Sequence, residues 1–220
     1  MVAETAERTE QAEADAQAFT LGADVFIAAV DQCLVAVARD DSRPVLTGVH
    51  VKVTSTAVEF ASADGFQLVI VNVPVKRAGD DWSAIIDAKA LKDALATVKA
   101  ADKATPRYAS ERTPVTITLA ENRQSVTLAA GTSTAVLPVI QGTFPDYQAL
   151  VPVGKPELEG NKVAFNGNMV GALLAKAGKY APLGIVRMRI QQPSQPMRFD
   201  WQSPEQWTAT AVVMPMFVTW

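Results

Sequence analysis

The sequence is poor in the residues that build disulfides, metal sites and proton relays. Among 220 residues it has one cysteine, Cys33, and one histidine, His50. One cysteine cannot form a disulfide within the chain, and one histidine cannot build a histidine-based zinc site. No Gly-Lys-Ser/Thr loop for nucleotide phosphates is present, and no nucleophile motif accompanies His50. We therefore expect no metal, no cofactor and no catalytic centre.

Long apolar runs and a strong net charge are lacking as well. No stretch approaches about eighteen consecutive apolar residues, so a membrane span is not expected. No basic stretch leads into an apolar run, so secretion is not indicated and we expect the cytoplasm. The net charge is −3, of which residues 1–17 carry −4 and the rest +1. A nearly neutral body argues against strong, indiscriminate binding of nucleic acid.

A pattern of one short strand, one helix and three strands occurs three times, within a composition that is 49% apolar and 20% charged. We name the repeats unit one (18–75), unit two (83–139) and unit three (162–214). Their expected helices cover about 23–38, 88–100 and 168–180, because apolar residues recur there at intervals of three and four. Expected strands, such as Val115–Leu119, alternate apolar and polar residues. The fold class is therefore α+β.

The repeats raise the question of how each unit covers its sheet. A single unit of this kind exposes one sheet face and one sheet edge, so it gains by pairing with another unit. Units one and two can satisfy each other. Unit three either packs on that pair or pairs with another chain. Residues 1–17 read as an acidic flexible tail, and the proline-rich residues 143–160 read as a linker.

Four segments, in order and with compatible spacing, resemble one protein family, the bacterial DNA polymerase III beta subunit or sliding clamp. Arg43–Val49 resembles the first long strand of a clamp domain, and Ala63–Leu68 resembles the family's Thr-Asp-Gly-His-Arg-Leu turn. Phe144–Pro152 resembles the segment that joins the second and third domains. Val212–Met216 resembles the C-terminal signature. Any one of these matches would be weak, whereas the four together are specific.

The resemblance implies a shortened clamp of about one and a half domains. Residues 18–142 resemble the middle clamp domain, and residues 161–220 resemble the second half of the last one. The first domain has no counterpart, so the usual ring seam between first and last domains cannot form in its usual way. A family ring contains twelve repeats, and four chains of three repeats also give twelve. We therefore predict self-association through residues 161–220.

The function implied by the resemblance is that of a non-catalytic processivity factor. It would assemble as a homo-oligomer around duplex DNA and bind polymerases or repair proteins in a bacterial or phage-infected cell; a clamp loader is a further implied partner. In the family a hydrophobic groove receives short peptides. Apolar edge strands and an ordinary hairpin would give the same pattern. Carried over by motif, the groove residues are Leu46, Gly65, Phe66, Leu68, Pro152, Val212, Met214, Pro215 and Met216.

A row of lysines indicates a second candidate surface, one that would face DNA. Four lysines on the helix of unit two fall within a sector of about 80°, and two more lie one turn apart in unit three. Such rows suit loose, sequence-independent contact with phosphates. A solvated helix face is the alternative reading for each helix. The lysines are Lys89, Lys92, Lys99, Lys103, Lys176 and Lys179.

A different function remains open beside the processivity factor. The chain could act as a clamp-like adaptor or regulator that binds partners without encircling DNA, an interpretation favoured by the neutral body and the absent first domain. An enzyme is the weakest hypothesis. His50 lies in an expected strand, and Cys33 lies on the apolar stripe of a helix, where a buried thiol is the expected reading.

Overall fold

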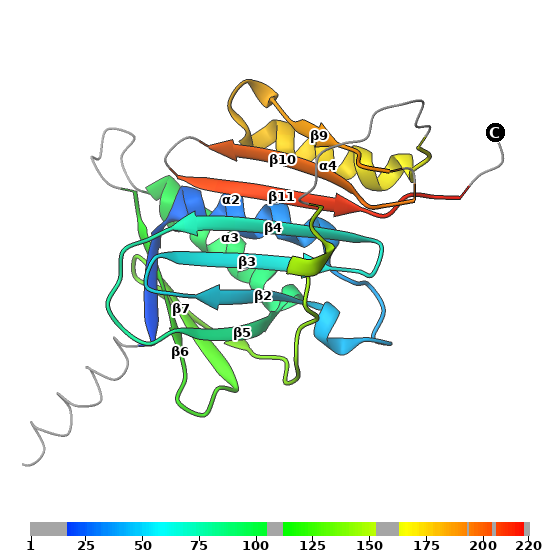
Figure 1. Ribbon diagram of the computed structural model, residues 1–220. Helices are drawn as coiled ribbons and strands as arrows, with labels where there is room; N and C mark the ends of the chain where they lie inside the picture. The colour runs from blue at the N-terminus through cyan, green and yellow to red at the C-terminus, as the bar shows by residue number, and fades with distance from the viewer. Residues whose placement is uncertain (1–16, 105–111, 153–162, 193, 204–205, 218–220) are drawn as a thin grey trace, which may run out of the picture.

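The computed structural model describes residues 17–104, 112–152, 163–192, 194–203 and 206–217, and its architecture is two antiparallel sheets with helices between and beside them (Figure 1). The expected tail (1–17), apart from residue 17, therefore lies outside the described residues. Residues 153–160 of the expected linker lie outside them as well. No helix in the described ranges is long and apolar enough to cross a membrane. Unit one contains β1 (Ala18–Gly22), α2 (Ala23–Cys33), β2 (Gly48–Val53), β3 (Ala57–Ala63) and β4 (Gln67–Pro74).

Unit two repeats this order of elements, and unit three repeats it from its helix onward. Short 3-10 turns occur at Leu34–Ala36, Pro44–Leu46, Gln148–Leu150 and Pro182–Gly184. Unit two contains β5 (Trp82–Asp87), α3 (Ala88–Ala104), β6 (Pro114–Leu119), β7 (Ser125–Ala130) and β8 (Ser133–Pro138). Unit three contains α4 (Gly167–Tyr180), β9 (Arg187–Arg189), β10 (Met197–Ser203) and β11 (Trp207–Val213).

Units one and two cover each other by exchanging their opening strands. β1 of unit one pairs with β6 of unit two, with Phe19 opposite Ile117, and β5 of unit two pairs with β2, with Ala84 opposite Val51. Each exchanged strand carries apolar side chains into the sheet of the other unit, and α2 packs against α3 between them. The exchange covers the edge of β2 in unit one and the edge of β6 in unit two.

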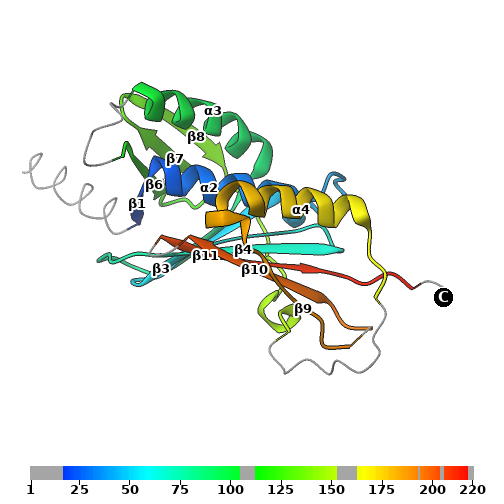
Figure 2. The ribbon, with the colours of Figure 1, turned by 90° about the horizontal axis from the view of Figure 1, so that it is seen from above.

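Unit three packs on unit one, which is the first of the two arrangements that the sequence left open. β11 pairs with β4 in antiparallel register, so that one seven-stranded sheet runs in the order β5-β2-β3-β4-β11-β10-β9. Seen from above, α3, α2 and α4 lie next to one another on the same side of that sheet, with α2 in the middle (Figure 2). The sheet face beneath α2 and α4 forms the main core with them.

Several elements differ in detail from the ranges that the sequence predicts. The first helix keeps α-helical hydrogen bonding only to Cys33 and ends in a 3-10 turn, and Pro44–Leu46 forms a 3-10 turn ahead of β2 where a strand was expected. Proline at the first position of that turn has no N–H to donate into a strand ladder. The expected opening strand of unit three is reduced, among the described residues, to a bridge between Ala164 and Met216.

The close approach of β5 to β2 gives a test of the exchange. An added Cβ at Gly48 would lie 2.6 Å from Ile85 Cγ2 and 2.8 Å from the Ile86 carbonyl oxygen. The Gly48→Ala change therefore forces β5 outward, and we expect it to lower the free energy of unfolding by about 1–3 kcal/mol. Urea unfolding measures the loss. The matched control is Gly167→Ala, where a Cβ meets nothing within 4 Å; equal effects of the two changes would contradict this account.

Candidate functional site

The apolar residues predicted for the groove converge where β4 meets β11. Leu68 and Val212 are direct cross-strand partners, and both belong with Leu46 to a second, smaller apolar cluster on the face of the sheet opposite the helices. All three side chains are almost fully buried. They come from unit one and unit three, and Leu68 and Val212 are more than a hundred residues apart in the sequence. They form the floor of the candidate site.

The exposed part of the candidate site is a rim beside this floor. Asp64 Oδ1 accepts hydrogen bonds from the N–H groups of Phe66 and Gln67, at 2.8 and 2.9 Å, and Gly65 takes a φ of +91° that favours glycine. This turn holds the Phe66 side chain 63% exposed. The Met214 N–H donates to the Phe66 carbonyl at 2.9 Å, which brings the exposed Met214 and Met216 and the half-buried Pro215 to the same place.

The third wall of the site is the segment that the sequence predicted as a linker. Phe144 stacks on His50 with ring centroids 5.0 Å apart, and the Tyr147 hydroxyl donates to Glu59 Oε1 at 2.5 Å. Both aromatic residues are buried in the smaller apolar cluster, and Val151 packs against it. The Pro152 carbonyl accepts from Arg198 at 3.1 Å. The first ten residues of the expected linker are therefore docked on the sheet.

The structure places His50 and Cys33 in structural positions. Burial lowers the pKa of His50, and its ring packs against the rings of Phe144 and Tyr147. Cys33 is fully buried on α2, as expected, and burial raises the pKa of its thiol. Over the described residues, no group of three or more His, Cys, Asp or Glu side chains is arranged to hold a metal ion.

A cleft of about 380 Å³ adjoins the rim on the helix side and was not predicted. Phe66 lines it together with Val37, Asn166 and Met169. Asn166 caps α4, since its side chain accepts from the N–H groups of Asn168 and Met169. No sequence signal identifies these residues as neighbours of Phe66, because they belong to other segments of the chain. The rim can thus contact a ligand on two sides.

The lysines of the two candidate helices have different surroundings. Lys89, Lys92, Lys99 and Lys103 are all exposed on α3, opposite the buried Leu91, Leu95 and Val98. On α4, by contrast, Lys176 donates to Asp31 Oδ1 and Lys179 to Asp31 Oδ2, each at 2.9 Å. The ammonium groups of unit three therefore bind a carboxylate of unit one in the free protein. The α3 lysines present the more available charge.

Asp31 of unit one accepts hydrogen bonds from three side chains of unit three. Burial by itself would raise the pKa of Asp31, but hydrogen bonds from Tyr180, Lys176 and Lys179 outweigh it and hold that pKa well below its ordinary value. In turn, burial and the bond to Asp31 raise the pKa of Tyr180 to about 12. Next to Asp31, buried Gln32 accepts a hydrogen bond from the Trp201 indole. These contacts fix α2 against unit three.

Removing the carboxylate charge tests these hydrogen bonds. We expect Asp31→Asn to lower the free energy of unfolding at pH 7 by about 2 kcal/mol, because charge-assisted hydrogen bonds are lost. Because the pKa of Asp31 is lower in the folded state than in the unfolded state, its ionised carboxylate stabilises the fold fully only at pH values above the unfolded-state pKa. The stability lost in the Asp31→Asn variant should therefore shrink as the pH falls below about 4. Urea unfolding across pH measures it. Exposed Asp81→Asn is the control, and a deficit independent of pH would contradict the charge-based origin.

Comparison with known proteins identifies the family. A family profile described as the DNA polymerase III beta subunit, central domain, matches residues 20–146, which is more than half of the chain. The chain belongs to the DNA polymerase III beta subunit family. It is 30% identical over 121 residues to the beta sliding clamp of Synechocystis sp., and 29% identical over 131 residues to the beta sliding clamp homolog GriR of Streptomyces muensis.

The chain is shorter than these relatives. Its matched segment covers 54% of the chain but 31% of the Synechocystis clamp, and 59% of the chain but 32% of GriR. The chain therefore spans about a third of the length of the curated relatives that it matches. The family profile itself, which matches residues 20–146, falls in units one and two.

Solved clamps extend the likeness of the fold to unit three. The Thermotoga maritima beta subunit aligns with a TM-score of 0.74 at 14% identity, covering 92% of this chain and 66% of that one. A Pseudomonas aeruginosa clamp bound to griselimycin aligns with a TM-score of 0.69 at 16% identity, covering 91% and 65%. The fold is the α+β fold of clamp-like repeats, in a shortened form of about one and a half clamp domains.

Proposed function

We propose that this clamp-family chain is a non-catalytic processivity factor, which assembles as a homo-oligomer around duplex DNA in the cytoplasm of a bacterial or phage-infected cell. The observation that supports it most is that Leu46, Leu68 and Val212 meet at the junction of β4 and β11, where Met214 also bonds to Phe66. Tethering of a polymerase raises its effective concentration at the DNA and needs no chemistry of its own. A clamp loader would be a further partner.

The peptide that this groove would take is short, extended and apolar. Exposed Met214, Met216 and Phe66 surround a buried aliphatic floor, and flexible thioethers adapt to different side chains. Where the family has His-Arg after the turn glycine, this chain has Phe66-Gln67. Gln67 is buried, and its side chain donates to the Val35 carbonyl and to Asp64. The site therefore has an aromatic wall instead of a cation, which favours apolar over acidic peptide residues.

Peptide binding can be tested at the rim without disturbing the floor. We expect Met214→Lys to weaken binding of a labelled peptide, taken from the clamp-binding segment of a DNA polymerase, by at least about tenfold, since a charge would replace apolar contact. Fluorescence anisotropy measures the affinity. The control is Val136→Lys, a more exposed position on β8, which belongs to the other sheet. Unchanged binding by the Met214 variant would remove the groove from the proposal.

DNA contact is assigned to the exposed face of α3. Replacing Lys89, Lys92, Lys99 and Lys103 by glutamate should weaken binding to duplex DNA. It should also reduce the slope of log K against log salt concentration by about 3.6, since each of the four phosphate contacts contributes about 0.9. In the control variant, Lys52 and Lys76, which are exposed outside that helix, are replaced by glutamate. The affinity of both variants for duplex DNA is measured over a range of salt concentrations. An equal loss of affinity in the two variants would indicate nonspecific attraction and not contact through α3.

The second candidate function is a clamp-like adaptor that binds partners without encircling DNA. The pairing of Lys176 and Lys179 with Asp31 favours it, because this contact removes positive charge from the helix layer. The two functions differ in topology. An encircling assembly is retained on nicked circular duplex and released when the circle is cut, whereas an adaptor binds the peptide but is not retained.

A further inference from the structure

Unit three exposes apolar residues at positions that are buried in the other two units. The eighth residue of each helix shows this first. Val30 in α2 and Leu95 in α3 are buried in the main core, whereas Leu174 in α4 is 40% exposed. Gly171 and Gly178 flank Leu174 on the same helix face, and a Cβ on either would meet nothing within 4 Å. α4 thus exposes an apolar side chain at a position that is buried in α2 and α3.

The first strand after the helix shows the same difference. In unit one Val51 pairs with Phe60 and is fully buried, because β5 continues the sheet beyond β2. In unit three Met188 pairs with Phe199 in the same way but is 55% exposed. Within the described residues the sheet ends at β9, and no strand lies beyond it. Arg187 and Arg189 are the strand neighbours of Met188 and point to the opposite face of the sheet. The face that carries Met188 therefore has no charge from β9.

The opening segment of unit three is the third unmatched feature. Two residues before their helices, Leu21 and Ile86 are buried in the exchanged strands, whereas Phe165 at the same position is 42% exposed. Ala164 bridges Met216 just after the last strand of its unit, as Ile86 of β5 bridges Val139 just after β8. The opening segment therefore sits beside its own unit as β5 does, without the second strand that β5 finds in β2.

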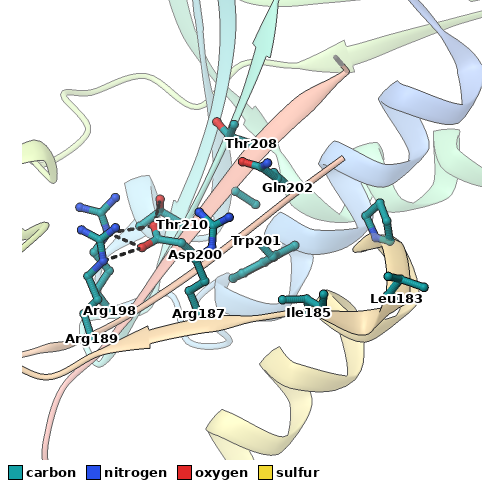
Figure 3. Close-up of a pocket in the computed structure, with 12 residues that line it drawn as sticks. Leu183, Ile185, Arg187, Arg189, Arg198, Asp200, Trp201, Gln202, Thr208 and Thr210 are labelled. Carbon is teal, nitrogen blue, oxygen red and sulfur yellow. Dashed lines mark hydrogen bonds and ion pairs between the residues drawn. The ribbon is translucent and has the colours of Figure 1, made fainter. Parts of the chain in front are cut away.

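A cleft continues the open edge of the sheet. β10 extends past the end of β9, so Trp201 to Ser203 pair with β11 alone. A cleft of about 450 Å³ lies there, with Leu183, Ile185 and Trp201 on its apolar side and with Asp200, its arginine neighbours, Gln202 and two threonines on its polar side (Figure 3). Leu183 and Ile185 are strongly exposed. Exposed apolar side chains of unit three therefore lie both on α4 and near the open edge of the sheet.

We propose that two copies of this chain pair through unit three by exchanging opening segments. Residues 163–165 of each copy lie along β9 of the other, and the two α4 helices pack together at Leu174. The ligand of this surface must supply an opening strand and an apolar helix face at once, and unit three itself offers both. Units one and two already form such a pair, in which each opening strand is paired with a strand of the other unit. The contact is two-fold and self-complementary, so it closes without forming a fibre.

The mass of the full chain in solution tests the pairing, which does not depend on binding of DNA or peptide. Light scattering after size exclusion, over a concentration series into the tens of micromolar, should give twice the mass of one 23.5 kDa chain. Leu174→Lys should raise the dissociation constant at least tenfold while leaving the circular dichroism spectrum of the folded chain unchanged, because Leu174 is exposed within one chain. Val136→Lys, on β8, should leave the dimer intact.

Cross-linking provides a second measurement that does not rely on loss of affinity. The native Cys33 is fully buried, so Leu174→Cys introduces a single accessible thiol. Mild oxidation should convert this variant to a disulfide-linked dimer, whereas Val136→Cys should remain monomeric on a denaturing gel. A wild-type chain that stays monomeric across the series overturns the proposal. So does an assembly whose mass Leu174→Lys leaves unchanged, since its contact must lie elsewhere.

Discussion

The pairing of β4 with β11 is the interaction on which the rest of the structure depends. It joins two units that are distant in sequence into one seven-stranded sheet. Because Leu68 and Val212 face each other across this pair, they form the apolar floor beneath the turn at Phe66. The same register brings the Met214 N–H to the Phe66 carbonyl. Without this ladder, the two halves of the candidate groove would belong to separate surfaces.

Polar contacts on the helix side determine how α4 lies on α2. Asp31 and Gln32 are buried on α2, where an unpaired carboxylate or amide would be costly. Lys176, Lys179 and Tyr180 satisfy the carboxylate, and Trp201 satisfies the amide. Apolar packing is indifferent to small rotations, whereas these directional contacts are not. They therefore give the shortened clamp a defined angle between unit one and unit three, and they place α4 lysines against an acid.

The three units differ in how completely they are covered. Units one and two exchange opening strands and bury their helices against each other, which leaves the outer face of α3 free to carry lysines. Unit three shares one edge of its sheet with unit one but retains an open edge at β9 and an open face on α4. An odd number of units in a fold that works in pairs therefore leaves apolar side chains of unit three exposed.

The sequence by itself determined the elements and the order of the repeats, because helical and strand periodicity depend on neighbours a few residues apart. The stripe of Leu91, Leu95 and Val98 identifies α3, and the alternation of Val115–Leu119 identifies β6. The groove residues came from motif resemblance. Only the tertiary structure decided that unit three docks on β4, that Lys176 and Lys179 bind Asp31, and that Tyr147 packs under the junction. Those outcomes depend on register and shape between segments distant in sequence, which local patterns do not encode.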